Sequence, residues 1–176
     1  MNWDWIGGFF DGEGSAYLSS QRRRDCRSGF TFRPTLKIAQ KDRRVVEEIH
    51  HFMGFGQVGS EGRKGMYWAW SVCSARQCLQ IIPKLLQHVL FKRHQLVLLE
   101  EACHLVAGSN HRPQTSISRL IEICAQMREL NGMRNIANRL DLDAARVAIA
   151  MATRNTTGVN GNSGIGWLST MNPVST

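Results

Sequence analysis

The fold is decided by residues 3–15, which read WDWIGGFFDGEGS. Large apolar residues stand beside paired glycines in this stretch, and two acids set between glycines follow them. Four apolar residues are spaced so that they would lie on one face of a helix: Trp5, Ile6, Phe9 and Phe10. Because each of the two central glycines costs a helix about 1 kcal/mol relative to Ala, we expect a close packing contact that offsets this cost.

The contact is predicted from two glycines that lie four residues apart, Gly8 and Gly12. Small residues at this spacing let two helix backbones approach closely, as they do in pairs of membrane helices. Since no other part of the chain repeats the pattern, the expected partner is the same helix of a second copy. The sequence therefore predicts a homodimer, with an interface made by Trp5, Gly8, Phe9 and Gly12.

Two acids, Asp11 and Glu13, stand where the predicted helix ends. In a pair of such helices the two Glu13 carboxylates would come close together, and like charges at short range repel unless cations separate them. Carboxylate oxygens suit a hard divalent ion, and Mg²⁺ held by one or two carboxylates and phosphate oxygens is the usual example. We therefore predict a Mg²⁺ site at Glu13, where Mn²⁺ or Ca²⁺ could substitute for binding; a solvated turn is the alternative for both acids.

The chain has 176 residues, enough for about one domain with a substantial core. We place that domain at residues 1–153 and a tail rich in Asn, Gly, Ser and Thr at residues 154–176. The net charge is +8, and residues 22–44 contain nine basic residues against two acids. Such a basic surface indicates a polyanion as the partner, although residues 22–27 taken alone could be a solvated loop.

The five cysteines form no CxxC pair and no zinc-type spacing, so free buried thiols in a reducing compartment are expected. The N-terminus has no signal-peptide pattern, and no apolar run reaches the roughly 20 residues that span a bilayer. We therefore expect an intracellular protein, in the cytoplasm or an organelle matrix, with no membrane partner.

Beyond the first helix, the chain predicts an alternation of strand pairs and helices. Residues 30–40 alternate apolar with polar side chains, which is typical of a strand with one buried face. Within this strand Pro34 lacks a hydrogen-bond donor and predicts an edge position or a bulge. The expected elements after the first helix are strands 15–24 and 30–40, helix 41–54, strands 56–62 and 66–72, and helices 74–86, 92–106, 116–130 and 141–152.

This order predicts an α+β fold in which a four-stranded antiparallel sheet is covered on one face and leaves the other face free for cations. Trp68 and Trp70 share one face of the last strand. Burial in the core is the default for both, and exposure on the cationic face is the alternative. Pro83 is a potential interruption of the helix at 74–86.

Residues 6–14, IGGFFDGEG, resemble the LAGLIDADG motif of homing endonucleases. They match it at the second glycine, two bulky apolar positions, the first acid, the small residue, the second acid and the final glycine, and they depart from it at Ile6 and Gly7. The resemblance covers about residues 3–130 and implies an α-ββ-α-ββ-α domain whose saddle-shaped sheet lies in the DNA major groove. With one motif, the chain is similar to the homodimeric branch of the family.

The resemblance also implies roles for single residues. Gln40 falls where the family commonly has a glutamine beside metal and water, and Arg44 falls at its arginine, with Arg43 as the alternative. Lys92, in the segment LFKRHQ, falls at the basic position of the active site. The implied site has Glu13 and the Gly12 carbonyl on the metal, Gln40 and Arg44 ordering water, and Lys92 stabilising developing negative charge. Asp11 fits better as a structural acid.

An intron-encoded type of homing endonuclease is the implied function: a homodimer that binds a long, pseudo-palindromic double-stranded site and hydrolyses one phosphodiester in each strand. Alternate residues of the first two strands would contact the bases: Tyr17, Ser19, Gln21, Arg23, Arg33, Thr35 and Lys37. Two alternatives remain, an RNA-splicing maturase that binds its host intron RNA and a non-catalytic DNA-binding regulator on the same scaffold.

Overall fold

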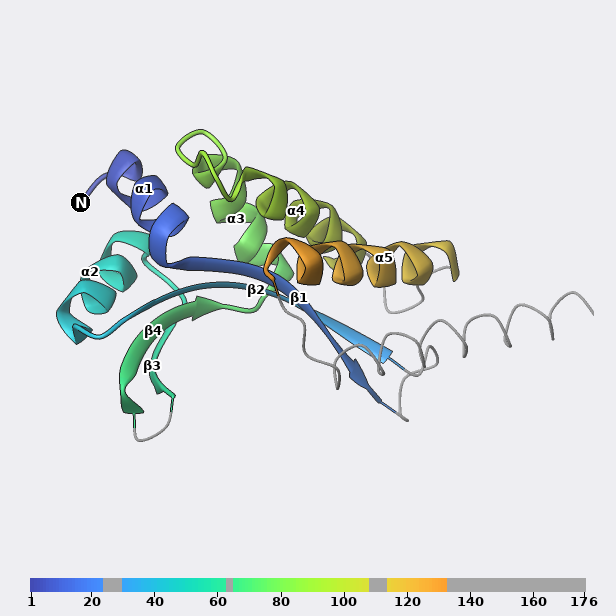
Figure 1. Cartoon of the computed structure of the whole chain (residues 1–176), viewed down its shortest axis with the longest axis horizontal. Helices are drawn as coiled ribbons and strands as arrows, with labels where there is room; N and C mark the ends of the chain where they lie inside the picture. The colour runs from blue at the N-terminus through green and yellow to red at the C-terminus, as the bar shows by residue number, and fades with distance from the viewer. Residues whose placement is uncertain (24–29, 63–64, 108–113, 133–176) are drawn as a thin grey trace, which may run out of the picture.

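The computed structural model describes residues 1–23, 30–62, 65–107 and 114–132 (Figure 1). Its elements are α1 (Trp3–Glu13), β1 (Gly14–Arg22), β2 (Phe30–Gln40), α2 (Arg43–Met53), β3 (Gln57–Glu61), β4 (Tyr67–Val72), α3 (Ala75–Leu85), α4 (Arg93–Ala107) and α5 (Gln114–Leu130). The predicted α+β order is confirmed. The helix predicted at 141–152 and the tail at 154–176 lie outside the described residues.

The four strands form one antiparallel sheet in the order β1-β2-β4-β3. Figure 1 shows the helices above this sheet, while the outer ends of β1 and β2 and the β3–β4 hairpin curve downward, so the lower face is concave. Strand β2 pairs with β4 only from Leu36 to Gln40. Pro34 therefore lies in a part of β2 that pairs with β1 alone, which confirms its predicted edge position.

The core lies between the upper face of the sheet and the helices. Leu36, Ile38 and Trp70 of the sheet are fully buried against apolar residues of α1, α3, α4 and α5. The indole nitrogen of Trp70 donates to the carbonyl of Phe55 at 2.9 Å, which satisfies its polar group. Trp68 lies on the same face and is half-buried, so the prediction that both tryptophans face the core is confirmed.

The four apolar residues on the predicted side of helix α1 differ in burial. Ile6 and Phe10, one turn apart, are buried in the core, whereas Trp5 and Phe9 stack on each other farther out, with ring centroids 4.6 Å apart. Adjacent residues of a helix point about 100° apart, so each pair forms its own stripe of this side. Phe9 is partly buried and packs against the core, and Trp5 is 42% exposed.

Local capping residues explain where the other helices begin and end. The Asp42 carboxylate accepts the backbone N–H of Arg44 at 2.9 Å, which caps α2, and Gly54 ends the helix with a φ of 75°. Pro83 lies inside α3, which continues to Leu85, so the predicted interruption does not occur. Across the described residues, none of the helices has the length and apolar character to cross a membrane.

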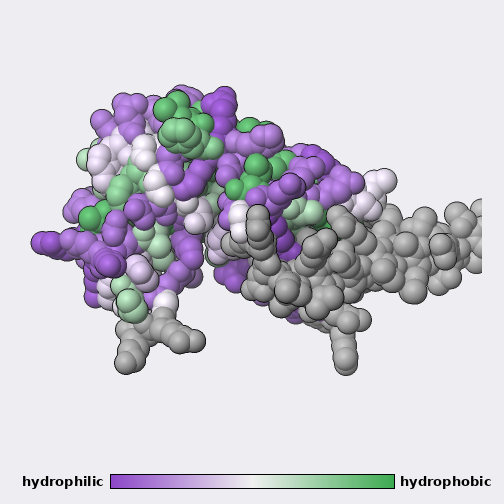
Figure 2. All heavy atoms as spheres, viewed as in Figure 1, coloured by the Kyte–Doolittle hydropathy of each residue, from purple (hydrophilic) through white to green (hydrophobic). Residues whose placement is uncertain are grey.

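The lower face of the sheet is covered by no described helix, and we call it the open face. It consists of every second residue of each strand: Ser15, Tyr17, Ser19 and Gln21 of β1, Thr31, Arg33, Thr35, Lys37 and Ala39 of β2, Tyr67, Ala69 and Ser71 of β4, and Gln57, Gly59 and Glu61 of β3. Hydrophilic side chains dominate the described surface in Figure 2, and the hydrophobic ones gather at the top, over the turn between α3 and α4.

Candidate functional site

The end of α1 is joined to the segment just before α4 by the Asp11 carboxylate. Its two oxygens accept the backbone N–H groups of Leu90, Phe91 and Lys92 at 2.6, 3.2 and 3.0 Å. Hydrogen bonds to an ionised acceptor are the stronger class in proteins. All of the described bonds of Asp11 therefore go to the backbone, as the prediction of a structural acid implies.

Lys92 makes the reciprocal connection. Its ammonium nitrogen donates to the carbonyls of Phe10, Gly12 and Gly14 at 3.0, 3.5 and 2.7 Å. These carbonyls lie at the C-terminal end of α1, where helix carbonyls lack intrahelical partners and the dipole favours a cation. Burial lowers the pKa of Lys92, and the charges of Asp11 and Glu13 partly oppose this effect. Lys92 thus positions the end of the helix that carries the two acids.

Glu13 is the last residue of α1 and is exposed. Within the described part of the chain its carboxylate has no hydrogen bond or ion pair, and no group of three His, Cys, Asp or Glu residues could hold a metal. A carboxylate with a backbone carbonyl one residue earlier is a donor set of hard oxygens, which fits Mg²⁺ rather than a soft metal. One chain supplies only part of such a site, so further oxygen ligands must come from elsewhere.

Gln40 is the last residue of β2 and lies at the end of the sheet where α1 is followed by β1. Gly14, the residue after Glu13, pairs with Ile38 of β2. Gln40 lies two residues after Ile38 on the same strand. Its side-chain oxygen accepts the backbone N–H of Lys41 at 2.7 Å. The structure therefore brings Glu13, Gln40 and Lys92 to one end of the sheet.

The two arginine candidates take different places at the start of α2. Arg44 pairs with Asp42, with one nitrogen 2.8 Å from Oδ2, and 87% of its side chain is exposed. This pairing raises the pKa of Arg44 and lowers that of Asp42, mainly through the side-chain hydrogen bond. Arg43 binds Glu47 at 2.7 Å and lies 4.4 Å above the ring of Trp68. Both arginines are held by protein partners, and neither contacts Glu13.

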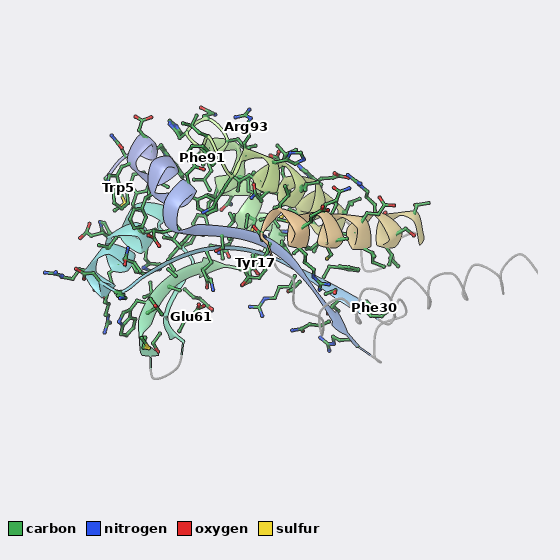
Figure 3. The ribbon with its side chains drawn as sticks, viewed as in Figure 1. Trp5, Tyr17, Phe30, Glu61, Phe91 and Arg93 are labelled. Atoms are coloured by element: carbon green, nitrogen blue, oxygen red, sulfur yellow. The ribbon has the colours of Figure 1, made fainter. Side chains whose placement is uncertain are left out.

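The residues nominated for base contacts fall on the open face, with one difference. Tyr17, Ser19 and Gln21 alternate along β1, and Figure 3 shows Tyr17 on the side of the sheet away from the helices. Arg33 pairs with Ser19 across β1 and β2, and Arg23 lies just beyond the end of β1. Thr35 is only 3% exposed, and its hydroxyl lies 3.7 Å from the sulfur of Cys73. Thr35 stands opposite Tyr17 of β1 and beside Cys73, which follows β4, and it presents almost no surface to a ligand.

The outer side of α1 has the character that the interface prediction requires. A Cβ atom built on Gly8 or Gly12 would meet nothing within 4 Å, so both glycines border open space. A Cβ on Gly7 would come within 2.5 Å of His88, which shows that this glycine is needed for packing inside the chain. The residues of this outer side are Trp5, Gly8, Phe9 and Gly12, all at least partly exposed.

Some residues at the site were not singled out from the sequence. Leu90 and Phe91 are 80% and 83% exposed, although they are large and apolar, and their backbone N–H groups donate to Asp11. Figure 3 shows Phe91 near the top of the molecule, at the start of α4. Glu61 ends β3 on the open face and binds Lys37 at 2.7 Å. No local pattern marks these contacts, because each joins residues that are more than 20 positions apart in the sequence.

The family model described as LAGLIDADG endonuclease matches residues 6–99. A comparison with curated proteins found no match. Among solved structures, the archaeal intron-encoded homing endonuclease I-Vdi141I, complexed with DNA, is 21% identical, with a TM-score of 0.77 over 86% of this chain and 96% of that one. The homing endonuclease I-CvuI, in complex with the I-CreI target, is 16% identical, with a TM-score of 0.72 over 84% and 94%. The homing endonuclease I-TnaI is 20% identical, with a TM-score of 0.71 over 85% and 98%.

Proposed function

The chain belongs to the LAGLIDADG endonuclease family, and from this premise we propose that it is a homing endonuclease that cuts double-stranded DNA as a homodimer. The observation that carries the proposal is the position of Glu13. Its exposed carboxylate lies at the junction of α1 with β1, at one end of the open face. A polymer lying along that face would therefore pass beside the acid.

The open face is suited to the major groove of DNA. Its exposed side chains include amides, hydroxyls and cations, and alternate residues of adjacent strands present them in rows. Arg and Lys contact guanine edges, and Gln contacts adenine edges. We propose Tyr17, Ser19, Gln21, Arg23, Arg33 and Lys37 as the residues that contact DNA, and we leave Thr35 out because it is buried.

The homodimer is proposed from the outer side of α1. The stacked rings of Trp5 and Phe9 provide apolar area, while Gly8 and Gly12 leave room for a second backbone. Pairing α1 with its copy would place two Glu13 side chains near one another and would continue the open face across both chains. Because a two-fold dimer repeats its contacts, the DNA site would be pseudo-palindromic.

The reaction we propose is hydrolysis of one phosphodiester in each strand, with a divalent ion held by Glu13 and the Gly12 carbonyl. Such an ion, when bound, activates water and neutralises negative charge at the phosphate. The residues of the chain hold the geometry: Lys92 and Asp11 fix the end of α1 and with it the backbone position of Glu13. Gln40 would orient water beside the phosphate, and an arginine of α2 would have to leave its present partner to join it.

Cleavage of a randomised double-stranded library, with Mg²⁺ and with EDTA, tests the proposal. We expect cutting with Mg²⁺ at one long, near-palindromic sequence and no cutting with EDTA. If the library is bound but never cut, a maturase or a DNA-binding regulator becomes the better description. The host intron RNA is then the next ligand to test.

A further inference from the structure

Glu61 is the only acidic residue within strands β1 to β4, and it lies on the open face. A carboxylate repels phosphates, whose negative charge dominates the affinity of DNA for proteins. The Glu61 side chain is 44% exposed, so a ligand on the open face can reach it. An acid at this position is unfavourable for general DNA binding and therefore suggests a specific task.

The side chain of Glu61 is directed by an ion pair that crosses the sheet. Its Oε2 lies 2.7 Å from the Nζ of Lys37. In the register of the sheet, Lys37 of β2 stands opposite Ser71 of β4, while Glu61 of β3 stands opposite Tyr67 of β4. On this face of β4, Ala69 lies between Ser71 and Tyr67, so the pair runs diagonally across Ala69. Figure 3 shows Glu61 at the lower part of the sheet.

The row of residues beneath the pair is unusually small. Ala69 pairs with Ala39 on one side and with Gly59 on the other. No long side chain therefore rises between Lys37 and Glu61. Ala69 belongs to the open face but is only 3% exposed, as expected if the two long side chains lie across it. This row of small residues therefore lets the Lys37 donor and the Glu61 acceptor lie side by side on the open face.

Two acceptors followed by a donor occur in only one kind of base pair in the major groove. Guanine presents two acceptors, N7 and O6, beside the N4 amino donor of cytosine. A lysine ammonium can contact both guanine acceptors while the neighbouring carboxylate accepts from cytosine. In an A·T pair the N6 amino donor of adenine stands between adenine N7 and thymine O4. An ammonium therefore reaches one acceptor and a carboxylate beyond the amino group faces a second acceptor, which makes this pair a poorer fit.

We propose that Lys37 and Glu61 together read one G·C base pair, Lys37 contacting guanine and Glu61 contacting the paired cytosine. The inference rests on the proposed function, because it requires DNA on the open face. Glu61 then acts as a specificity-determining residue: it keeps Lys37 away from phosphates and rejects a base pair that lacks the cytosine amino group. In a homodimer the same pair would be read once in each half-site.

Selection of bound sequences from a randomised double-stranded library, with EDTA present to prevent cutting, tests the assignment. The unmodified chain is compared with Glu61→Gln, Lys37→Met and Glu122→Gln. The last variant is the control, because Glu122 is an exposed acid paired with an arginine on α5, in the helical layer. We expect Glu61→Gln and Lys37→Met to reduce the preference for G·C by about ten-fold at the same base pair. Other positions, and all positions in the control, should keep their preferences.

Three results would overturn the inference. Glu61→Gln could raise the affinity for all sequences and leave every base preference unchanged, which would make Glu61 a simple counter-ion of Lys37. The two variants could change different base pairs, or the shared position could prefer A·T. In these cases the unmodified chain still selects a long site, so the proposed function stands. If the unmodified chain binds no DNA at all, both proposals fail together.

Discussion

At the scale of single residues, Asp11 and Lys92 hold the end of α1 from two sides. Asp11 accepts three backbone N–H groups from the segment before α4, and Lys92 donates to three backbone carbonyls of the α1–β1 junction. Each side chain therefore binds backbone groups of the other segment. Glu13 lies between these contacts, so its position depends on both.

We therefore expect Asp11→Asn to destabilise the chain. The asparagine amide keeps the size of the side chain but loses the charge and one acceptor oxygen, so one or two of the three backbone donors lose their acceptor and the rest keep only a neutral one. The expected loss in the free energy of unfolding is about 1–3 kcal/mol, measured by urea denaturation. Asp4→Asn is the control, because Asp4 is exposed and makes one described bond, to His88. An equal loss in the two variants would contradict the account.

The sequence predicted Asp11 as structural and Glu13 as the metal ligand, but it could not provide the partners of either. The N–H groups that bind Asp11 come from residues about 80 positions later in the chain. In the same way, alternation predicted that Thr35 faces outward, yet its burial depends on how β1 and β4 enclose it. Periodicity determines the direction of a side chain, and tertiary packing determines whether it remains accessible.

At the scale of elements, the two sides of α1 separate folding from assembly. Gly7 packs on His88 inside the chain, whereas Gly8 faces open space one residue later. The spacing to Gly12 placed Gly8 in the predicted interface, but the sequence indicated no partner for Gly7. The close approach of Gly7 to His88, in the turn after α3, depends on tertiary packing.

Replacement of Gly8 by leucine should leave the fold intact and abolish the homodimer. The side chain has free space in one chain, and leucine favours a helix more than glycine does, whereas the second copy would be pushed away. Sedimentation should give a monomer with an unchanged or higher melting temperature. The contrasting variant is Gly7→Ala, which should lower the melting temperature because the new Cβ would overlap His88. A Gly8→Leu chain that still forms dimers would disprove the helix pairing.

Helices α4 and α5 are joined by an ion pair that should respond to acid. Arg119 binds both carboxylate oxygens of Glu101, at 2.6 and 2.8 Å, and lowers the pKa of Glu101 below its ordinary value of 4.5. The pair therefore stabilises the fold fully above pH 4.5 and less as the pH falls through the lowered pKa.

The stabilisation should stay below about 1 kcal/mol, because both side chains are over one third exposed. Melting temperatures of the unmodified chain and of Glu101→Gln should differ near pH 6 and converge near pH 3. A difference that persists or grows in acid would rule out the pairing as its source.

At the scale of the whole molecule, the described helices cover one face of the sheet and leave the concave face free (Figure 1). The exposed side chains of this open face are mostly polar or charged. This layered arrangement could be predicted from the order of the elements and the alternation in residues 30–40. The curvature of the sheet could not be predicted from these patterns, because it arises from strand pairing along the whole length, and only the family resemblance implied it. The Lys37–Glu61 pair follows from that pairing and was likewise not predictable.

Removal of one cationic side chain from the open face should lower the affinity for DNA and make that affinity less sensitive to salt. We expect Arg33→Ala to reduce affinity for the selected site and, if Arg33 binds phosphate, to reduce the slope of log affinity against log salt by about one. Arg76→Ala is the matched control, since Arg76 is exposed on α3 in the helical layer. Equal effects in the two variants would mean that DNA does not lie on the open face.

The central claim is that Glu13 carries the chemistry, and the most direct test is the rate of cleavage of the selected DNA site by Glu13→Gln in Mg²⁺. We expect Glu13→Gln to bind this site in EDTA as tightly as the unmodified chain does. With Mg²⁺ it should cut at a rate reduced on the order of 100-fold or more. If Glu13→Gln cuts as fast as the control Glu122→Gln, then Glu13 is not the metal ligand and the active site lies elsewhere.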